Sequence, residues 1–349
     1  MTVYQEWNKG QLIGGRYHIC ETLGCGSIAI TYLAFDEKAN KNVVLKTIKP
    51  ELLNQLTVSE LKDLKLKFLQ EAVNLSRCHH SNIVKFLDIF HDKKTDLIYI
   101  IMEYIEGRTL ESYRKIWSPK EALKYIKQIG DALTYLHHQG IIHRNVKPSN
   151  IMLQNGPLGK VVLIGFSVAQ SFNHNLTNVN SNNADSFTPK ELFLQEDKKG
   201  PFTDVYSLSA TLYFLLTKEL PPSVKARKLS LLGPDNRNRR ELREPKEIVD
   251  TISESVNQAI IKGMAIEAKD RYPSIEILLE SLRIRHYLPK KFTEQLNRAS
   301  AKLDKMNLVI TIIGIIVGIG GMIFGFLSPS NPNCPPYVQE REANHQLNP

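Results

Sequence analysis

Apolar and polar residues alternate in three runs between residues 17 and 46: YHICETL, IAITYLAF and NVVLK. The runs are rich in Val, Ile, Thr and Tyr, which favour strands, and the turn sequences GCGS and EKANKN separate them. Two more apolar runs, VKFLDIF and LIYIIMEYI, follow. This pattern predicts a strand-rich unit over about residues 17–103.

A helical spacing of apolar residues interrupts the strand pattern once, in residues 52–78. The residues at this spacing are Leu61, Leu64, Phe68, Ala72 and Leu75. After residue 103 the character of the chain changes, and helical spacing dominates as far as about residue 285. The Asn-rich stretch 173–183 is the exception, because it has little apolar surface to bury and is predicted to be a mobile loop.

Residues 118–139 carry the strongest helix pattern in the chain. Ser118 is a natural N-cap, and Pro119 suits the first helical position. Glu121 completes a capping box with Ser118, and Gly140 follows the last apolar position as an end signal. We therefore expect a long helix here, with one face buried.

The last 67 residues differ from the rest of the chain. Residues 283–307 form a basic linker, and residues 308–327, LVITIIGIIVGIGGMIFGFL, contain no charge. Such a stretch is long enough to cross a bilayer as a helix, and it lacks the amphipathic stripe expected of a buried core helix. We predict a single transmembrane helix at 308–327, followed by a short Pro-rich tail, 328–349.

Composition and charge are consistent with this organisation. With 349 residues, 42% of them hydrophobic, the chain can bury a two-lobed core and one or two small appendages. The formal charge is +9, and part of it lies in a cluster at 225–246. Aromatic residues are not interleaved with this cluster, so nucleic-acid binding is not expected. Residues 1–16 show no charged-then-apolar run, and no secretory signal is expected there.

Three motifs carry chemistry. LGCGSIA, residues 23–29, is a glycine-rich turn between two predicted strands, which fits a phosphate-covering loop better than a dinucleotide site. Lys46 ends a strand, and Glu71 lies in the next helix, as in a Lys–Glu pair that holds phosphates. IIHRNVKPSN, residues 141–150, follows the pattern H-R-D-x-x-x-x-N except at Asn145.

These motifs resemble the eukaryotic-type Ser/Thr protein kinase family, in the form also found as membrane-anchored bacterial receptors. The likeness runs from about Tyr17 to Leu282 and includes HSNIVKF, MEYIEGRTL, TPKEL, DVYSLSATLYFLLT and KGMAIEAKDRYPS. It implies an α+β, two-lobed kinase-like fold, with a β-rich N-lobe at about 17–103 and a helical C-lobe at about 104–282.

The resemblance also assigns roles to residues. The nucleotide-binding positions are Gly24, Gly26, Lys46, Glu71, Glu103 and Ile105. The positions that support the fold are His143, Arg144, Glu191, Asp204 and Arg271, with Glu191 and Arg271 expected to form an ion pair. Residues 141–150 correspond to the catalytic loop of the family. Lys147 and Asn150 keep the residue types of this loop, and Asn150 is the one metal-ligand position that is retained.

The chain departs from the family pattern at the two acids that carry the chemistry. Asn145 replaces the catalytic base, and Gly165, in GFS, replaces the Asp of the metal-binding D-F-G motif. Asp185 is expected to lie in a mobile loop, Asp204 resembles a structural residue at the start of a buried helix, and neither follows a strand that would direct it to the phosphates. Val44 and Ala29 also differ from the usual Ala and Gly, which adds bulk near the adenine and stiffens the phosphate cover.

Two hypotheses about function follow. In the first, the chain is a pseudokinase that acts in signalling or as a scaffold, with ATP as a ligand of the cleft and with Mg²⁺ binding disfavoured by Gly165. In the second, it is an active Ser/Thr protein kinase with an unorthodox site, supported by Lys147 and Asn150. Metal-dependent ATP binding and autophosphorylation discriminate between the two.

The predicted span leads to expectations about location and assembly. Seven basic residues precede the span in 283–306, and only Arg341 follows it. The positive-inside rule then places the kinase-like domain in the cytoplasm and the tail outside, in the cell membrane. A stripe of four glycines suits close helix pairing in a homodimer or with another spanning protein. The stripe consists of Gly314, Gly318, Gly321 and Gly325.

Overall fold

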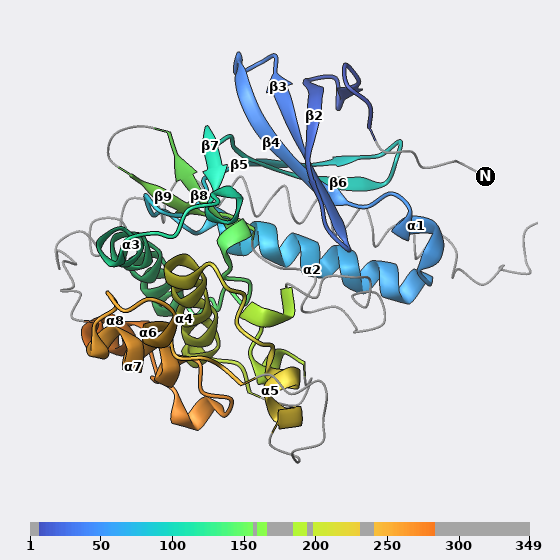
Figure 1. The fold of residues 1–349 in the computed structure, drawn as a ribbon. Coiled ribbons are helices and arrows are strands. Elements are labelled where there is room, and N and C mark those ends of the chain that lie inside the picture. Colours follow the sequence, from blue (N-terminus) through green and yellow to red (C-terminus); the bar gives the residue numbers. More distant parts are fainter. Residues whose placement is uncertain (1–6, 156–158, 166–183, 194–197, 231–240, 283–349) are drawn as a thin grey trace, which may run out of the picture. The chain divides into compact units, whose positions relative to one another are not determined.

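The structure is a computed structural model and describes residues 7–155, 159–165, 184–193, 198–230 and 241–282. Its first part is a six-stranded antiparallel sheet. The strand order is β1-β2-β3-β4-β6-β5 (Figure 1). The strands are β1 (Leu12–Ile13), β2 (Tyr17–Cys25), β3 (Ala29–Asp36), β4 (Lys41–Ile48), β5 (Phe86–Asp92) and β6 (Leu97–Glu103). The alternating pattern of residues 17–46 thus forms three neighbouring strands, as predicted.

The residues before the predicted domain start also belong to this sheet. Leu12 and Ile13 pair with His18 and Tyr17 as an edge strand. Trp7 reaches across the sheet, where its indole Nε1 donates a 2.8 Å hydrogen bond to the hydroxyl of Tyr99 on β6. Residues 7–16 therefore cover a sheet face that would otherwise expose apolar side chains.

Helix α2 (Val58–Ser76) packs against β5 beneath the sheet (Figure 1). The single helical region predicted at 52–78 is instead divided into α1 (Leu52–Gln55) and α2. The reason is local: the hydroxyl of Thr57 accepts from the backbone N–H of Glu60, and the Glu60 carboxylate accepts from the N–H of Thr57. This capping box starts a new helix.

The second part is helical, with a small three-stranded sheet in the order β7-β8-β9. The short strands are β7 (Gly107–Thr109), β8 (Ile151–Gln154) and β9 (Val161–Leu163), and 3₁₀ turns lie at Leu110–Ser112, Pro148–Asn150, Ala184–Phe187, Lys190–Leu192 and Ala268–Asp270. The helices are α3 (Pro119–His138), α4 (Pro201–Thr217), α5 (Val224–Ser230), α6 (Pro245–Ile248), α7 (Glu254–Gly263) and α8 (Ile275–Ser281).

Helices α3 and α4 pack side by side and form the core of this part (Figure 1). Helix α3 has the predicted capping box between Ser118 and Glu121 and buries the face marked by its apolar residues. Helix α4 is buried on all sides from Thr203 to Thr217. Because α4 is surrounded by protein, it holds the residues at its two ends in fixed positions.

Backbone hydrogen bonds join the two parts beside the catalytic loop. The N–H of Val84 donates to the carbonyl of Leu163 at 3.0 Å, and the N–H of Leu163 donates to the carbonyl of Asn82 at 2.8 Å. The Asn82 side chain also donates to the carbonyl of Val161 and to Gln128 of α3. Asn82 therefore fixes the segment before β5 against β9.

No helix within the described ranges is long and apolar enough to cross a membrane. The predicted span at 308–327 and its glycine stripe lie outside the described residues, as do the linker, the tail and the Asn-rich stretch 173–183. Asp185, which was predicted to lie in a mobile loop, lies in the 3₁₀ turn Ala184–Phe187.

Candidate active-site cleft

A lysine of the sheet and a glutamate of α2 form an ion pair. The Nζ of Lys46 on β4 lies 2.5 Å from Oε1 of Glu71, and the side chains are only 13% and 6% exposed. Burial raises the pKa of the Glu71 carboxyl, and the Lys46 ammonium opposes this effect. The pair holds α2 against the sheet with Lys46 in the position that a kinase uses to bind phosphates.

The glycine-rich turn connects β2 to β3 with little freedom. The N–H of Gly26 donates to the carbonyl of Ala29 at 2.9 Å, and Ile28 is buried. Gly24 and Gly26 are exposed, and a Cβ on Gly24 would meet no atom within 4 Å. Val44, which was expected to add bulk near the adenine, lies in β4 and pairs with Met102 of β6.

The segment with the predicted nucleotide-binding positions Glu103 and Ile105 connects the two parts of the fold. Glu103 ends β6, and its carboxylate accepts from the backbone N–H of Lys85 at 2.8 Å. Ile105 is buried just beyond it. Gly107 then enters β7, where an added Cβ would lie 2.1 Å from the carbonyl oxygen of Leu153, so a side chain is excluded there.

Asp204, at the start of α4, organises the catalytic loop. Its carboxylate accepts from the backbone N–H of His143 at 2.8 Å and of Arg144 at 2.7 Å, and from Nε2 of His137 at 2.8 Å. Burial raises its pKa, but these partners outweigh burial and lower it overall. Arg144 has a φ of +64°, and the two hydrogen bonds to Asp204 hold this uncommon conformation.

The imidazole of His143 is fully inside the protein. Burial lowers its pKa to about 4, and the nearby charge of His137 and Lys46 acts in the same direction, whereas Asp204 opposes it. His143 is therefore neutral at physiological pH. His137 was missed by the motif reasoning, because its position on α3, six residues before His143, becomes informative only when α3 is packed on α4.

Asn145, Asn150 and Gly165 are brought together at the end of the loop. The side-chain Nδ2 of Asn145 donates to the carbonyl of Gly165 at 3.2 Å, and Nδ2 of Asn150 donates to the carbonyl of Asn145 at 2.8 Å. The backbone N–H of Ile164 in turn donates to the carbonyl of Asn150. The amide of Asn145 thus links the loop to the residue that replaces the metal-binding Asp.

These groups do not fit the Mg²⁺ ion that the kinase fold implies. Mg²⁺ in phosphate sites is held by one or two carboxylates together with the phosphates. Gly165 supplies no side chain, Asn145 uses its amide to donate, and Asn150 offers one neutral oxygen. The described residues contain no cluster of three His, Cys, Asp or Glu side chains that could hold a metal.

Lys147 is the other catalytic-loop position at which this chain keeps the residue type of the family. It precedes the Pro148–Asn150 turn and is partly buried, and burial lowers the pKa of its ammonium group, while Glu111 opposes this. Among the described residues it has no hydrogen-bond or ion-pair partner.

A buried ion pair holds the segment after the loop. The guanidinium nitrogens Nη1 and Nη2 of Arg271 donate to the Glu191 carboxylate at 2.8 and 3.1 Å, and the two side chains are 0% and 4% exposed. Thr203 donates a further hydrogen bond to Glu191. The structure thus contains the pair that the resemblance implied, between residues 80 positions apart.

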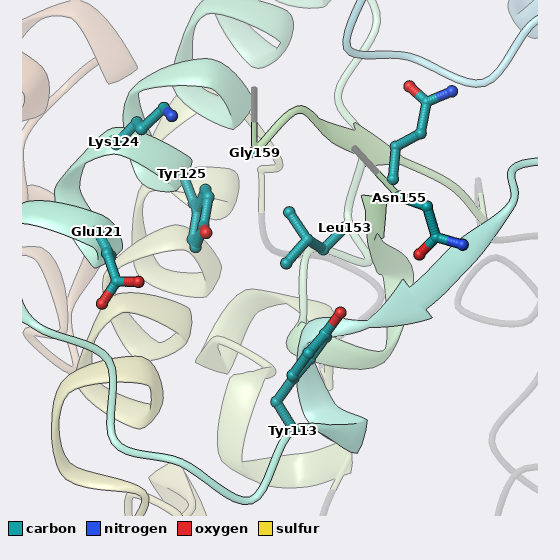
Figure 2. Close-up of a pocket in the computed structure, with 8 residues that line it drawn as sticks. Tyr113, Glu121, Lys124, Tyr125, Leu153, Asn155 and Gly159 are labelled. Atoms are coloured by element: carbon teal, nitrogen blue, oxygen red, sulfur yellow. The ribbon is translucent and has the colours of Figure 1, made fainter. Parts of the chain in front are cut away.

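A polar pocket of about 470 Å³ lies elsewhere, between the start of α3 and the end of β8 (Figure 2). Its lining residues are Tyr113, Glu121, Lys124, Tyr125, Leu153, Gln154, Asn155 and Gly159. None of the predicted site residues lines it. We assign this pocket no role in the chemistry.

The comparisons with known proteins agree with this fold. A family model described as the protein kinase domain matches residues 17–282. The chain therefore belongs to the protein kinase family, and the predicted family and two-lobed fold are confirmed. The serine/threonine-protein kinase PrkC of Bacillus subtilis (strain 168) is 29% identical over 279 residues, which cover 76% of this chain and 40% of PrkC.

Solved structures support the fold. The apo form of PpkA-294 has a TM-score of 0.62 at 20% identity and covers 79% of this chain and 99% of its own. Rad53 1-466 in complex with AMP-PNP has a TM-score of 0.59 at 20% identity and covers 78% of this chain and 66% of its own. Because this chain spans only about 40% of the length of PrkC, the activity of that whole protein is not carried over.

Proposed function

We propose that the chain is a pseudokinase: a protein kinase fold that acts through binding, in signalling or scaffolding, with phosphoryl transfer absent or very slow. The observation that carries the proposal is the contact of Asn145 with Gly165. At the position where a kinase needs a general base, this chain has the amide of Asn145. At the position where a kinase needs a metal ligand, it has only the backbone of Gly165. Loss of the general base alone costs roughly 10²–10⁴-fold in rate.

The retained residues support a binding role. Asp204, Glu191 and Arg271 stabilise the catalytic loop and the segment after it, and neither task involves phosphoryl transfer. The Lys46–Glu71 pair holds α2 against the sheet. We propose that ATP binds in the cleft beside Lys46, by analogy with the AMP-PNP complex of Rad53, and that binding needs little help from Mg²⁺.

A second candidate, an active Ser/Thr kinase with an unorthodox site, is favoured by one feature. The Lys46–Glu71 pair is formed, as activity in a kinase requires, and relatives such as PrkC are named as kinases. This candidate relies on the retained Lys147 and Asn150 of the catalytic loop, with Asn150 holding one metal ion.

Restoring both acids separates the two candidates. We expect the double variant Asn145→Asp, Gly165→Asp to autophosphorylate detectably, provided that Val44 and Ala29 admit the nucleotide. Gly165 has a φ of +72°, and an added Cβ would lie 3.0 Å from Oδ1 of Asn150, so the new side chain is tight and strained. The matched control is Asn145→Asp, Gly165→Asn, which has the same strain without the carboxylate. Wild-type turnover equal to that of the repaired protein would contradict the proposal.

We also propose a location and an assembly, both from sequence. Residues 308–327 span the cell membrane once, with the kinase domain in the cytoplasm and the tail outside. The glycine stripe pairs two spans. Replacement of Gly318 and Gly321 by Ile should abolish self-association of the span in a membrane reporter assay, whereas Gly320→Ile, off the stripe, should leave it unchanged.

A further inference from the structure

A buried lysine joins helix α2 to the hairpin formed by β5 and β6. The Nζ of Lys65 on α2 lies 2.5 Å from Oδ2 of Asp96 in the hairpin turn, and the Lys65 side chain is only 6% exposed. Lysine is rarely buried to this extent unless its charge is paired, because removing the ammonium group from water is costly. The pair therefore attaches the helix that carries Glu71 to a second point of the sheet.

The hairpin turn presents Asp96 to the helix. The Asp92 carboxylate accepts a 3.0 Å hydrogen bond from the backbone N–H of Lys94 within the turn. Asp96 has a φ of +53°, in the left-handed region that aspartate adopts more readily than most residues. Nε2 of His91 donates to Oδ1 of Asp96 at 2.9 Å. Burial raises the pKa of the Asp96 carboxyl, but the hydrogen bonds from Lys65 and His91 outweigh burial and lower it overall.

Strand β6 connects this ion pair to the one in the cleft. Asp96 directly precedes β6, and Ile100, four residues later, is the register partner of Lys46 on β4. The first six residues of β6 are buried, so the strand holds Asp96 and the partner of Lys46 at a fixed separation of about 13 Å. Along α2, Lys65 and Glu71 are about 9 Å apart. A rigid strand and a rigid helix are thus joined at two points.

Two ion pairs restrain α2 more completely than one. A shift of the helix by one residue turns each side chain by about 100° about the helix axis, so it breaks both pairs at once. The apolar face of α2 restrains this motion less sharply, because apolar contacts are not directional. Desolvation offsets most of the attraction within a buried ion pair, and such a pair can serve to specify one arrangement rather than to add stability.

We propose that Lys65 is a positioning residue for nucleotide binding. Through Asp96 it sets the rotation and axial position of α2, and the position of α2 decides whether Glu71 holds Lys46 in the cleft. The inference rests on the proposed function, in which ATP binds beside Lys46, and it names a residue on which this binding depends. Without Lys65, α2 is attached to Lys46 alone, and Lys46 is directed at the phosphates for a smaller part of the time.

The test measures ATP affinity by calorimetric titration of the full chain in detergent micelles. Lys65→Met should weaken ATP binding by roughly three- to tenfold, as expected for the partial loss of a charged hydrogen bond. Glu71→Gln should weaken it by at least as much. Because Lys65 acts through Glu71, the double variant should bind ATP as weakly as Glu71→Gln alone. A purely structural Lys65 would instead change the melting temperature and leave the ATP affinity of the folded protein unchanged.

Two further variants keep the result interpretable. Lys67→Met is the matched control, because Lys67 lies on the same helix and its 2.6 Å ion pair with Asp63 stays within α2. This variant should bind ATP like the wild type. Asp96→Asn removes the charge but keeps the left-handed turn, which asparagine also adopts readily. It should weaken ATP binding in the same direction as Lys65→Met, and it tests the proposal even if Lys65→Met fails to fold.

A second measurement tests the same positioning without nucleotide. In the wild type the Lys46 side chain is 13% exposed and paired with Glu71. A water-soluble amine reagent, with the product quantified by mass spectrometry, should label Lys46 severalfold faster in Lys65→Met than in the wild type, because release of α2 frees the ammonium group. Lys67→Met should be labelled at the wild-type rate.

The outcomes separate this inference from the proposed function. Unchanged labelling of Lys46 in Lys65→Met, wild-type ATP affinity in this variant, or losses of affinity that multiply in the double variant with Glu71→Gln would each overturn the positioning role. A wild type that binds no ATP would overturn the proposed nucleotide binding, and faster labelling of Lys46 in Lys65→Met would then still support the role of Lys65 in placing Lys46.

Discussion

The side-chain amide of Asn145 donates a hydrogen bond to the backbone carbonyl of Gly165, with 3.2 Å between nitrogen and oxygen. An aspartate at 145, as kinases have, cannot make this bond, because an ionised carboxylate only accepts. The amide at 145 therefore adds a bond between the catalytic loop and the backbone at the degenerate metal position. The site of this chain thus contains a hydrogen bond that a kinase site with an aspartate at 145 lacks.

The first prediction concerns this contact. Asn145→Asp alone should lower the free energy of unfolding by about 1–3 kcal/mol, since it replaces a donor by an acceptor facing the carbonyl of Gly165. Chemical denaturation measures the change. The control is Asn155→Asp on the exposed end of the β8–β9 connection, where we expect less than about 0.5 kcal/mol. Equal effects of the two substitutions would show that the amide contact does not stabilise the loop.

The second prediction concerns the buried pair. Arg271→Met leaves the carboxylate of Glu191 buried without its cation and should destabilise the protein by about 3–5 kcal/mol. Adding Glu191→Gln to this variant should restore part of the loss. By contrast, Arg243→Met breaks the exposed pair with Glu219 and should cost no more than about 1 kcal/mol. A cost for Arg271→Met as small as that for Arg243→Met would argue against the buried pair.

The third prediction is a pH dependence from His143. Because burial lowers its pKa to about 4, the unfolded chain binds a proton below about pH 6.5 while the folded protein does not. Above about pH 6.5, the pKa of His143 in the unfolded chain, the free energy of unfolding is not reduced by this group. As the pH falls from about 6.5 towards 4, protonation of His143 in the unfolded chain lowers the free energy of unfolding. Lowering the pH from 7.5 to 5 should therefore cost about 2 kcal/mol of stability through His143.

The control for this effect is His143→Phe, which cannot titrate. Its stability should fall less than that of the wild type over the same pH range, and the difference between the two curves isolates His143 from His80, whose pKa burial also lowers. Parallel curves would mean that His143 titrates alike in the folded and unfolded states.

The sequence predicted the elements whose signals are local. The capping box of Ser118 and Glu121 defined α3, and alternation over residues 17–46 defined three strands. The break before Thr57 was missed although Thr57 and Glu60 form the same kind of box, because continuous apolar spacing across 52–78 obscured it. Local signals were thus sufficient to predict these elements, except where the capping box at Thr57 lay within a continuous apolar spacing.

The parts of the site that depend on packing could not be read from the sequence. The motif letters located Asn145 and Gly165, but the hydrogen bond between them depends on how the residues after β9 lie beside the loop, where the N–H of Ile164 donates to the carbonyl of Asn150. Lys65 belongs to no motif, and its ion pair with Asp96 depends on how α2 packs against β5. The same holds for Trp7, which bonds to Tyr99 across 92 residues of sequence.

The fourth prediction tests the orientation in the membrane. An impermeant thiol reagent should label Cys334 on intact cells if the tail lies outside the cytoplasm. The Cys334→Ser variant is the control, because it leaves the three cysteines of the kinase domain in place. Labelling of the wild type only after lysis would place the tail on the cytoplasmic side.

The central claim is that the cleft lacks a functional metal site, and the most direct measurement is a thermal-shift titration of the full chain with ATP, with and without Mg²⁺. Gly165 supplies no carboxylate and Asn150 only one neutral oxygen, so stabilisation by ATP should be nearly the same with Mg²⁺ or with EDTA. Lys46→Met, which removes the phosphate-binding cation, should abolish the shift in both conditions. Strong stabilisation only when Mg²⁺ accompanies ATP would contradict the account and favour an active kinase.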